Sequence, residues 1–566
     1  MKHLKFTILL FLFFACQSQR SYTPIPSETG PLGENAMISS AHPLATKVGL
    51  EVLKNGGNAI DAAVAVKFAL AVVYPRAGNI GGGGFAVYRM NDGTIGSLDF
   101  REKAPQAANR NMYLDVNGKV IEDMSTIGYK AAGVPGSVDG ILKLHNKLGT
   151  RPLSELLQPA INLAYYGFTI TQDQADEFNE KREVFAQVNG SDFFLVKDQL
   201  WEAGDTIKFT ELAGTLTQIR DHGREGFYGG IVADQIVKEM QYGGGLITEA
   251  DLKNYNAKWR EPIAGSYRGY RVISMPPPSS GGVALLQLLQ GAEQYDIQKM
   301  GHNTTETIHL MTELERRVYA DRATHLGDPD YYDVPVKMLL SPDYNKERFS
   351  DISLKKKTDS QEIKEGEVEI IESVETTHFS IVDPEGNAVS LTTTLNSFFG
   401  CKVYVKGAGF FLNNEMDDFS AKPGVSNQFG LVGGEANAIQ PEKRMLSSMT
   451  PTIVEKDGEL KMVVGTPGGA TIITSNFQAI LNVIDHGMGM QDAVNATRTH
   501  SQWLPDRILI EERPLDPRVV LKLEKMGHEI EPREAMGRMD CILIREDGKL
   551  EGGADYMRGD NYAEGF

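Results

Sequence analysis

The stretch TTHFSIVDPEGNAVSLTTTLNSFFG, at residues 376–400, decides the fold of this chain. Polar and apolar residues alternate on both sides of PEGN, as expected for two β-strands joined by a turn. The stretch therefore predicts a β-hairpin. Thr376 and His378 stand two residues apart in its first strand, so their side chains lie on the same face of that strand.

A charged segment precedes the hairpin. Residues 355–375 read KKKTDSQEIKEGEVEIIESVE, which is dense in charges of both signs and poor in large apolar side chains. Such a segment buries little surface, so we expect it to be mobile and exposed.

Two helices are predicted upstream, at residues 45–53 and 59–73, because NGGN at residues 55–58 supplies a helix stop followed by a helix cap. The second helix is almost entirely Ala and Val, so it should be buried on most sides. The glycines of GNIGGGG, at residues 78–84, indicate close backbone packing, because a phosphate-binding loop would need a preceding strand and a following Lys-Ser/Thr pair. Residues 135–345 are predicted to be mostly helical, because their apolar residues recur at the spacing of an α-helix.

The N-terminus has the pattern of a secretory signal peptide. Basic residues precede an apolar run at residues 6–15, which is shorter than the roughly 20 residues that span a bilayer. Cys16 follows Ala15 and begins a polar stretch, a pattern similar to a bacterial lipoprotein processing site. We therefore expect a signal peptide at residues 1–15, lipidation of Cys16, a tether at residues 16–34 and a periplasmic, membrane-anchored protein. The alternative is a plain secreted protein that is cut nearby.

The composition is that of a globular protein. The chain has 566 residues, of which 41% are hydrophobic and 23% charged, and these values exclude disorder of the whole chain. The formal net charge of −18 repels phosphate backbones, so nucleic acid is not expected as a partner. Three cysteines are too few for a disulfide framework. The sequence leaves open whether Cys401 and Cys541 pair.

Several motifs occur along the chain in a recognisable order. They are LDFREKAP (98–105), MPPPSSGG (275–282), YADRATHLGDP (319–329), the 376–400 hairpin, LNNEMDDFSAKPG (412–424), RMLSSMTPT (444–452) and GTPGGATIIT (465–474). Together they resemble the γ-glutamyltranspeptidases, or glutathione hydrolases. The resemblance implies an α/β fold, the αββα sandwich of N-terminal nucleophile hydrolases. It also implies a precursor that cleaves itself into a large subunit (35–375) and a small subunit (376–566), which share one core.

The resemblance also implies a mechanism centred on Thr376. Cleavage between Glu375 and Thr376 gives the nucleophile its own free α-amine, whose pKa of about 7.7–8 suits a general base. Thr376 would then attack a γ-glutamyl amide such as glutathione, and water, an amino acid or a dipeptide would accept the γ-glutamyl group. The chemistry requires no cofactor. We interpret His378 as a satisfied core residue rather than as the base.

Further site residues follow from the same family positions. A donor α-carboxylate calls for Arg and hydroxyl groups, and the matching residues are Arg101, Ser447 and Ser448. An α-ammonium calls for carboxylate and amide oxygens, and the matching residues are Asn396, Glu415 and Asp418.

The oxyanion hole and the lid have family counterparts as well. Gly468 and Gly469 match the backbone donors that stabilise the tetrahedral oxyanion. Thr394 matches the residue that assists self-cleavage. Residues 422–438 resemble the lid loop of the family, and Phe429 stands where an aromatic residue, often Tyr, gates the pocket.

Three alternatives remain at this point. Within the superfamily, the rival functions are those of a cephalosporin or glutaryl acylase and of a poly-γ-glutamate hydrolase, although the complete set of carboxylate and ammonium ligands favours free γ-glutamyl compounds. A third possibility is a non-catalytic surface lipoprotein that uses the fold for binding. The presence of Thr376, Thr394, Gly468 and Gly469 argues against it.

Overall fold

The predicted hairpin forms the middle of a sheet in the computed structural model, which describes residues 25–360, 362–363, 376–422 and 434–566. Strand β10 (Thr376–Val382) pairs antiparallel with β11 (Ala388–Thr394), and the register places Thr376 opposite Thr394. The prediction of a hairpin is therefore confirmed. Glu375, Phe429 and Cys16 lie outside the described residues.

Two seven-stranded antiparallel sheets form the centre of the molecule. The first has the order β21 (Tyr562–Gly565), β2 (Met37–Ser40), β10, β11, β3 (Gly83–Arg89), β4 (Ile95–Asp99) and β7 (Lys258–Arg260). The second has the order β1 (Leu32–Gly33), β20 (Leu550–Ala554), β19 (Asp540–Ile544), β15 (Glu459–Val464), β14 (Thr452–Lys456), β9 (Tyr270–Ser274) and β8 (Ile263–Tyr267). Each sheet contains strands from both sides of residue 376, so the two parts of the chain interleave.

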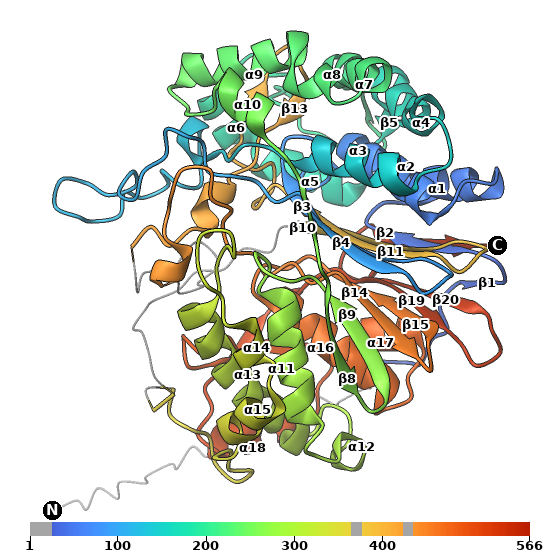
Figure 1. Ribbon diagram of the computed structural model, residues 1–566, viewed down its shortest axis with the longest axis vertical. Helices are drawn as coiled ribbons and strands as arrows, with labels where there is room; N and C mark the ends of the chain where they lie inside the picture. Colours follow the sequence, from blue (N-terminus) through green and yellow to red (C-terminus); the bar gives the residue numbers. More distant parts are fainter. Residues whose placement is uncertain (1–24, 361, 364–375, 423–433) are drawn as a thin grey trace, which may run out of the picture.

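Helices cover the outer face of each sheet (Figure 1). The first sheet is covered by α1 (Pro43–Lys54), α2 (Ala59–Val73), α3 (Ser137–Leu148), α4 (Leu153–Tyr166), α5 (Gln172–Glu180), α6 (Arg182–Asn189), α7 (Thr210–His222), α8 (Glu225–Tyr228), α9 (Gly230–Gly243) and α10 (Glu249–Asn254). The second is covered by α11 (Gly281–Ala292), α12 (Ile297–Met300), α13 (Thr305–His325), α14 (Val336–Leu339), α15 (Pro342–Arg348), α16 (Thr471–Ile484), α17 (Met490–Asn495) and α18 (Pro517–Lys525). A short three-stranded sheet of β16 (Thr499–His500), β17 (Ile508–Glu511) and β18 (Ile530–Arg533) lies beside α16 and α18.

The alternation predicted for β10 sorts its side chains between two cores. Phe379 and Ile381 join the apolar core under the helices of the first sheet. Ser380 points the other way and donates a hydrogen bond to the carbonyl oxygen of Asp540 in the second sheet, at 2.7 Å. A third apolar cluster fills the space between the sheets. Thr376 and Ser380 are an even number of residues apart, so their side chains lie on the same face of β10, the one that faces the second sheet.

The upstream predictions are confirmed. The Asn58 side chain caps α2 by accepting from the Asp61 N–H at 2.9 Å, and every residue of α2 is buried. The glycine-rich loop that follows packs closely against the hairpin. A Cβ on Gly82 would overlap the carbonyl oxygen of Thr394, so only glycine lets this loop approach the end of β11.

The expectation that the charged segment is exposed holds for Lys355, Lys356, Asp359 and Glu362 but is wrong for Ser360 and Ile363, which are buried. Lys357 Nζ pairs with Asp506 at 2.9 Å, and the indole N–H of Trp503 donates to the Ser360 carbonyl oxygen at 3.1 Å. Ser360 is buried. The chain before the predicted cleavage site is therefore attached to residues that follow it, because buried partners were available that local composition does not reveal.

The two cysteines within the described residues do not pair. Cys401 and Cys541 are both buried and free. They belong to different apolar clusters, one under each helical layer. Among the described residues, we find no helix whose length and apolar character would let it cross a membrane.

Candidate active site

A small pocket at the open end of the β10–β11 hairpin collects the predicted site residues. It is lined by Arg101, Thr376, Thr394, Asn396, Glu415, Asp418, Ser447, Ser448, Met449, Gly469 and Ile472. We call this the Thr376 pocket. Its free volume is about 20 Å³, since ion pairs among its own side chains fill most of the space.

Thr376 and Thr394 enter the pocket from paired strand ends. Thr376 is 8% exposed, and Thr394 lies directly opposite it. The Thr394 hydroxyl accepts a hydrogen bond from the Asn396 N–H at 2.7 Å, which turns the chain sharply at the end of β11. Asn396 adopts a φ of 75°, a left-handed conformation that Asn tolerates better than most residues. The turn brings residues 394 and 396 to the same pocket.

Arg101 follows β4 and reaches the pocket from the first sheet. Its guanidinium contacts the carboxylates of Glu415 and Asp418, and it donates to the Leu446 carbonyl oxygen at 3.2 Å. Glu415 and Asp418 lie on one 3₁₀ turn, Glu415–Asp418. The groups predicted to bind opposite ends of an amino acid thus neutralise each other.

Carboxylates outnumber cations around Arg101. Glu102 Oε2 lies 3.7 Å from its guanidinium, in addition to the two contacts above. Burial raises the pKa of Glu415 well above its usual value and raises the pKa of Glu102 to about 7. Burial also lowers the pKa of Lys67, next to Glu102, to about 7. This surplus of buried acids favours binding of a further cation.

The serine pair is held by the loop that precedes α11. The Ser447 N–H donates to the Pro278 carbonyl oxygen at 2.9 Å, and the Ser280 N–H donates to the Ser447 carbonyl oxygen at 2.7 Å. The Ser448 hydroxyl accepts a hydrogen bond from Arg322 at 3.1 Å. Both hydroxyls therefore lie on a rigid backbone in the wall of the pocket.

Gly468 and Gly469 form the entry to α16. Their φ angles are 140° and 54°, values that favour glycine. The Gly468 carbonyl oxygen accepts from the Thr471 N–H at 3.0 Å, so the turn is closed at the start of the helix. Gly469 lines the Thr376 pocket, whereas Gly468 is not among the lining residues. A helix N-terminus presents free N–H groups and a positive potential, which suits a developing oxyanion.

Comparison with known proteins shows the family of this chain. The family described as Gamma-glutamyltranspeptidase matches residues 45–565. The chain belongs to the γ-glutamyltranspeptidase family. It is 48% identical to the glutathione hydrolase proenzyme of Pseudomonas sp. (strain A14), with 91% of this chain and 90% of the relative covered. It is 44% identical to the glutathione hydrolase proenzyme of Escherichia coli (strain K12), with 94% and 92% covered.

The fold is also shared with solved structures. The cephalosporin acylase from Bacillus halodurans superposes with a TM-score of 0.83 at 26% identity, over 97% of this chain and 98% of that chain. The mixed α/β architecture with two antiparallel sheets is therefore common to γ-glutamyltranspeptidases and this acylase.

His378 has the structural role that the sequence suggested for this γ-glutamyltranspeptidase. Its ring is fully buried between the hydroxyls of Thr392 and Ser380, at 2.8 and 3.1 Å. Burial lowers the pKa of His378 to about 3, so the imidazole is neutral at pH 7. Both ring nitrogens are occupied within the sheet, and His378 does not line the Thr376 pocket.

One residue that contacts the site of this γ-glutamyltranspeptidase is not among the site residues predicted from the sequence. Arg322 lies in the motif YADRATHLGDP and bonds directly to Ser448. No sequence signal separates it from the other charged residues of α13, because Glu313, Arg316, Arg317 and Asp321 are buried as well.

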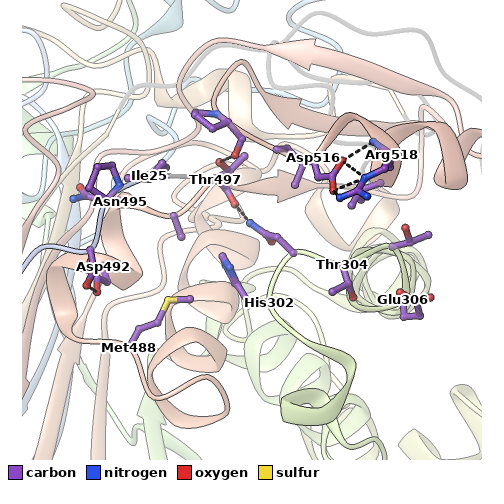
Figure 2. A pocket seen from close by; sticks show the side chains of 18 of the residues that line it. Ile25, His302, Thr304, Glu306, Met488, Asp492, Asn495, Thr497, Asp516 and Arg518 are labelled. Carbon is purple, nitrogen blue, oxygen red and sulfur yellow. Dashed lines mark hydrogen bonds and ion pairs between the residues drawn. The ribbon is translucent and has the colours of Figure 1, made fainter. Parts of the chain in front are cut away.

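A cavity much larger than the Thr376 pocket lies elsewhere in this family member. It has a volume of about 840 Å³ and is open between the N-terminal end of α13 and helices α17 and α18. Figure 2 shows His302, Thr304, Asp492 and Arg518 on its walls. None of the predicted site residues lines it, so size alone does not identify the reactive site.

Proposed function

We propose that this protein is a self-cleaving γ-glutamyl hydrolase and transferase that acts on glutathione and related γ-glutamyl amides. The observation that carries the proposal is the Thr376 pocket, which combines one nucleophile with ligands for a carboxylate, an ammonium and an oxyanion. Relatives of nearly full length that are named glutathione hydrolase proenzymes support it. The chain would belong to the N-terminal nucleophile hydrolases, with residues 35–375 and 376–566 as large and small subunits of one heterodimer.

The reaction begins after cleavage has freed the α-amine of Thr376. This amine takes the proton of the Thr376 hydroxyl, and Oγ1 attacks the γ-carbonyl carbon of the donor. Backbone N–H groups at Gly468 and Gly469 stabilise the oxyanion. The amine then returns the proton to the leaving nitrogen, and a γ-glutamyl ester remains on Thr376. Water or an acceptor amine attacks this ester, loses its proton to the α-amine and releases the product, which restores the free hydroxyl.

Donor selection follows from the charges of the pocket. The ammonium of a γ-glutamyl group would pair with Glu415 and Asp418, while its α-carboxylate would pair with Arg101 and the hydroxyls of Ser447 and Ser448. Substrate would thus exchange partners with the ion pairs that close the pocket in the free protein.

The likeness to a cephalosporin acylase makes an acylase the second candidate. A glutaryl group has no ammonium to pair with the buried carboxyl group of Glu415, and this group, whose pKa burial already raises, would have to bind a proton instead. The surplus of carboxylates beside Arg101 therefore favours γ-glutamyl donors over glutaryl donors.

Export and anchoring form a separate part of the proposal. Residues 1–15 would be removed as a signal peptide, Cys16 would carry lipid, and residues 16–34 would tether a periplasmic enzyme. The end of this tether is attached to the enzyme, because Ser27 and the Glu28 N–H both bond to Asp492, at 2.5 and 2.6 Å. Cys16→Ser should move the enzyme from the membrane fraction to the soluble fraction; wild-type protein that is already soluble and begins beyond Cys16 would favour plain secretion.

The function is tested with matched donors. Purified enzyme is assayed with γ-glutamyl and glutaryl p-nitroanilides, each with and without glycylglycine as acceptor. We expect release of nitroaniline from the γ-glutamyl donor, faster release with the dipeptide, and little release from the glutaryl donor. A preference for the glutaryl donor would identify an acylase, and inactivity of the cleaved enzyme on both donors would contradict the proposal.

A further inference from the structure

Arg322 is a buried arginine beside the Thr376 pocket that has hydroxyl partners instead of carboxylate partners. It lies near the C-terminal end of α13 and is 4% exposed. Its Nε donates to the Ser280 hydroxyl at 2.9 Å, and its Nη2 donates to the Ser448 hydroxyl at 3.1 Å. In the parts of the chain that the structure describes, no carboxylate forms a salt bridge with it.

The other two arginines of the same helix differ in this respect. Arg317 pairs with Glu313 at 2.9 Å, and Arg316 pairs with Asp506 at 2.5 Å. A buried guanidinium without a counter-ion is unfavourable, so such a group usually has a functional reason. Although burial lowers the pKa of Arg322 to about 10, the side chain is charged at neutral pH.

The contact with Ser448 determines what that hydroxyl can do. A guanidinium has donors only, so the Ser448 oxygen must accept, and its own proton is left to donate to another group. Ser448 lines the Thr376 pocket. Ser280 fixes the other side of the guanidinium, and its backbone N–H also holds Ser447. One arginine therefore links the loop before α11 to the serine pair.

Arg101 alone does not supply a free positive charge to this pocket, because Glu415 and Asp418 already contact it. A γ-glutamyl donor brings one further carboxylate together with its ammonium. Arg322 has no carboxylate within salt-bridge distance among the described residues, although the charge of Asp418 is close enough to raise its pKa against the effect of burial.

We propose that Arg322 is a positioning and specificity-determining residue for the donor α-carboxylate. It orients Ser448 as a hydrogen-bond donor to that carboxylate and balances the negative charge of the carboxylate from behind the serine. This inference rests on the proposed function, since it assumes a γ-glutamyl donor in the Thr376 pocket.

The test compares two donors that differ by one group. γ-Glutamyl p-nitroanilide carries the α-carboxylate, and 4-aminobutanoyl p-nitroanilide lacks it but keeps the ammonium. For Arg322→Met we expect KM for the first donor to rise about 10- to 100-fold with a smaller change in kcat. For the second donor, kcat/KM should change by less than about threefold, since the lost interaction is absent. Arg322→Lys keeps the positive charge but lacks the planar guanidinium that contacts both serines, so the loss of kcat/KM for the γ-glutamyl donor should be intermediate.

A double-mutant cycle shows whether Arg322 acts through Ser448. Ser448→Ala should also reduce the difference in kcat/KM between the two donors. Adding Ser448→Ala to Arg322→Met should lower kcat/KM for the γ-glutamyl donor little further than Arg322→Met alone. Arg317→Lys is the matched control, a buried arginine of the same helix away from the pocket. Arg317→Lys should leave the ratio of the kcat/KM values for the two donors unchanged.

The outcomes separate this inference from the proposed function. If wild type does not use the γ-glutamyl donor, the proposed function fails. If wild type does use it, but Arg322→Lys and Ser448→Ala lower kcat/KM equally for both donors, Arg322 has a structural role and the inference is overturned. Should Arg322→Met not fold, Arg322→Lys and Ser448→Ala still decide between these outcomes.

Discussion

The guanidinium of Arg101 contacts the carboxylate of Glu415, 314 residues further along the chain, and both side chains are 1% exposed. The predicted cleavage site lies between these two residues in sequence. The pair therefore joins the proposed large and small subunits at the point where the donor would bind. A zwitterionic donor can replace it without leaving either charge unpaired, which gives the pocket a physical reason to prefer amino-acid groups.

The first prediction concerns Arg101→Lys. Lysine keeps the charge but loses the bidentate geometry, so kcat/KM for a γ-glutamyl donor should fall by about one to two orders of magnitude. Most of the loss should appear in KM, because the carboxylate is bound alike in ground and transition states. Self-cleavage needs no substrate carboxylate, so the variant should still mature. The measurement is steady-state kcat/KM of the cleaved variant for a γ-glutamyl donor and for a matching donor that lacks the α-carboxylate. If the ratio of these two values is the same as in wild type, Arg101 does not bind the carboxylate.

Thr394 is expected to control maturation. Thr394→Val keeps the shape but removes the oxygen that accepts from the Asn396 N–H, at a cost of about 1–3 kcal/mol for a buried unpaired donor. The turn beside Thr376 should loosen, and self-cleavage should slow markedly. Thr394→Ser is the control, because it retains the acceptor. The measurement is the fraction of uncut chain over time on denaturing gels, and equal rates for both variants would show that the hydroxyl is not needed.

Asp506 should hold the cleaved fragments together. Its carboxylate pairs with Arg316 and Lys357, at 2.5 and 2.9 Å, on the other side of the cleavage site. Asp506→Asn should lower the free energy of unfolding of the mature enzyme by about 1–3 kcal/mol, since buried Arg316 loses a charged partner. Thermal denaturation measures the effect. Asp547→Asn, at an exposed carboxylate 3.8 Å from Arg545, should change stability by less than about 0.5 kcal/mol. If Asp506→Asn and Asp547→Asn change stability equally, the pairing of Asp506 with Arg316 and Lys357 does not help to hold the two fragments together.

Acid should destabilise the protein partly through His378. Its pKa is lowered to about 3 by burial, whereas an unfolded chain binds the proton below about 6.5. Stability from this group is complete above pH 6.5 and is lost as the pH falls toward 3. Between pH 7 and 5 the loss amounts to about 2 kcal/mol. Urea unfolding of uncut Thr376→Ala should show that decrease, and the added change His378→Gln should remove it; an unaltered pH dependence would mean that His378 is not buried neutral.

Much of this structure was predictable because its signals are local. Alternation in the 376–400 hairpin, the Asn58 cap and the apolar composition of α2 each predict the element that forms. The positions of Arg101, Glu415 and Ser448 could be assigned only through family resemblance, since nothing local says that three distant segments meet.

Other features depend on long-range packing that sequence patterns do not carry. The charged segment looked exposed, yet Ser360 is buried against Trp503 because the fold brings a matching surface to it. Arg322 looked like one more charge in a helix, and its importance appears only when its partners, two serines from separate loops, are known.

In the proposed mechanism, Thr376 carries the γ-glutamyl group during turnover. Mature enzyme should be mixed with a γ-glutamyl donor, quenched in acid and digested, and the peptide that begins Thr-Thr-His-Phe analysed by mass spectrometry. We expect one γ-glutamyl group on Thr376 of that peptide, and a Thr376→Ala chain that stays uncut and unlabelled. A γ-glutamyl group on a different residue, or turnover by the uncut Thr376→Ala chain, would contradict it.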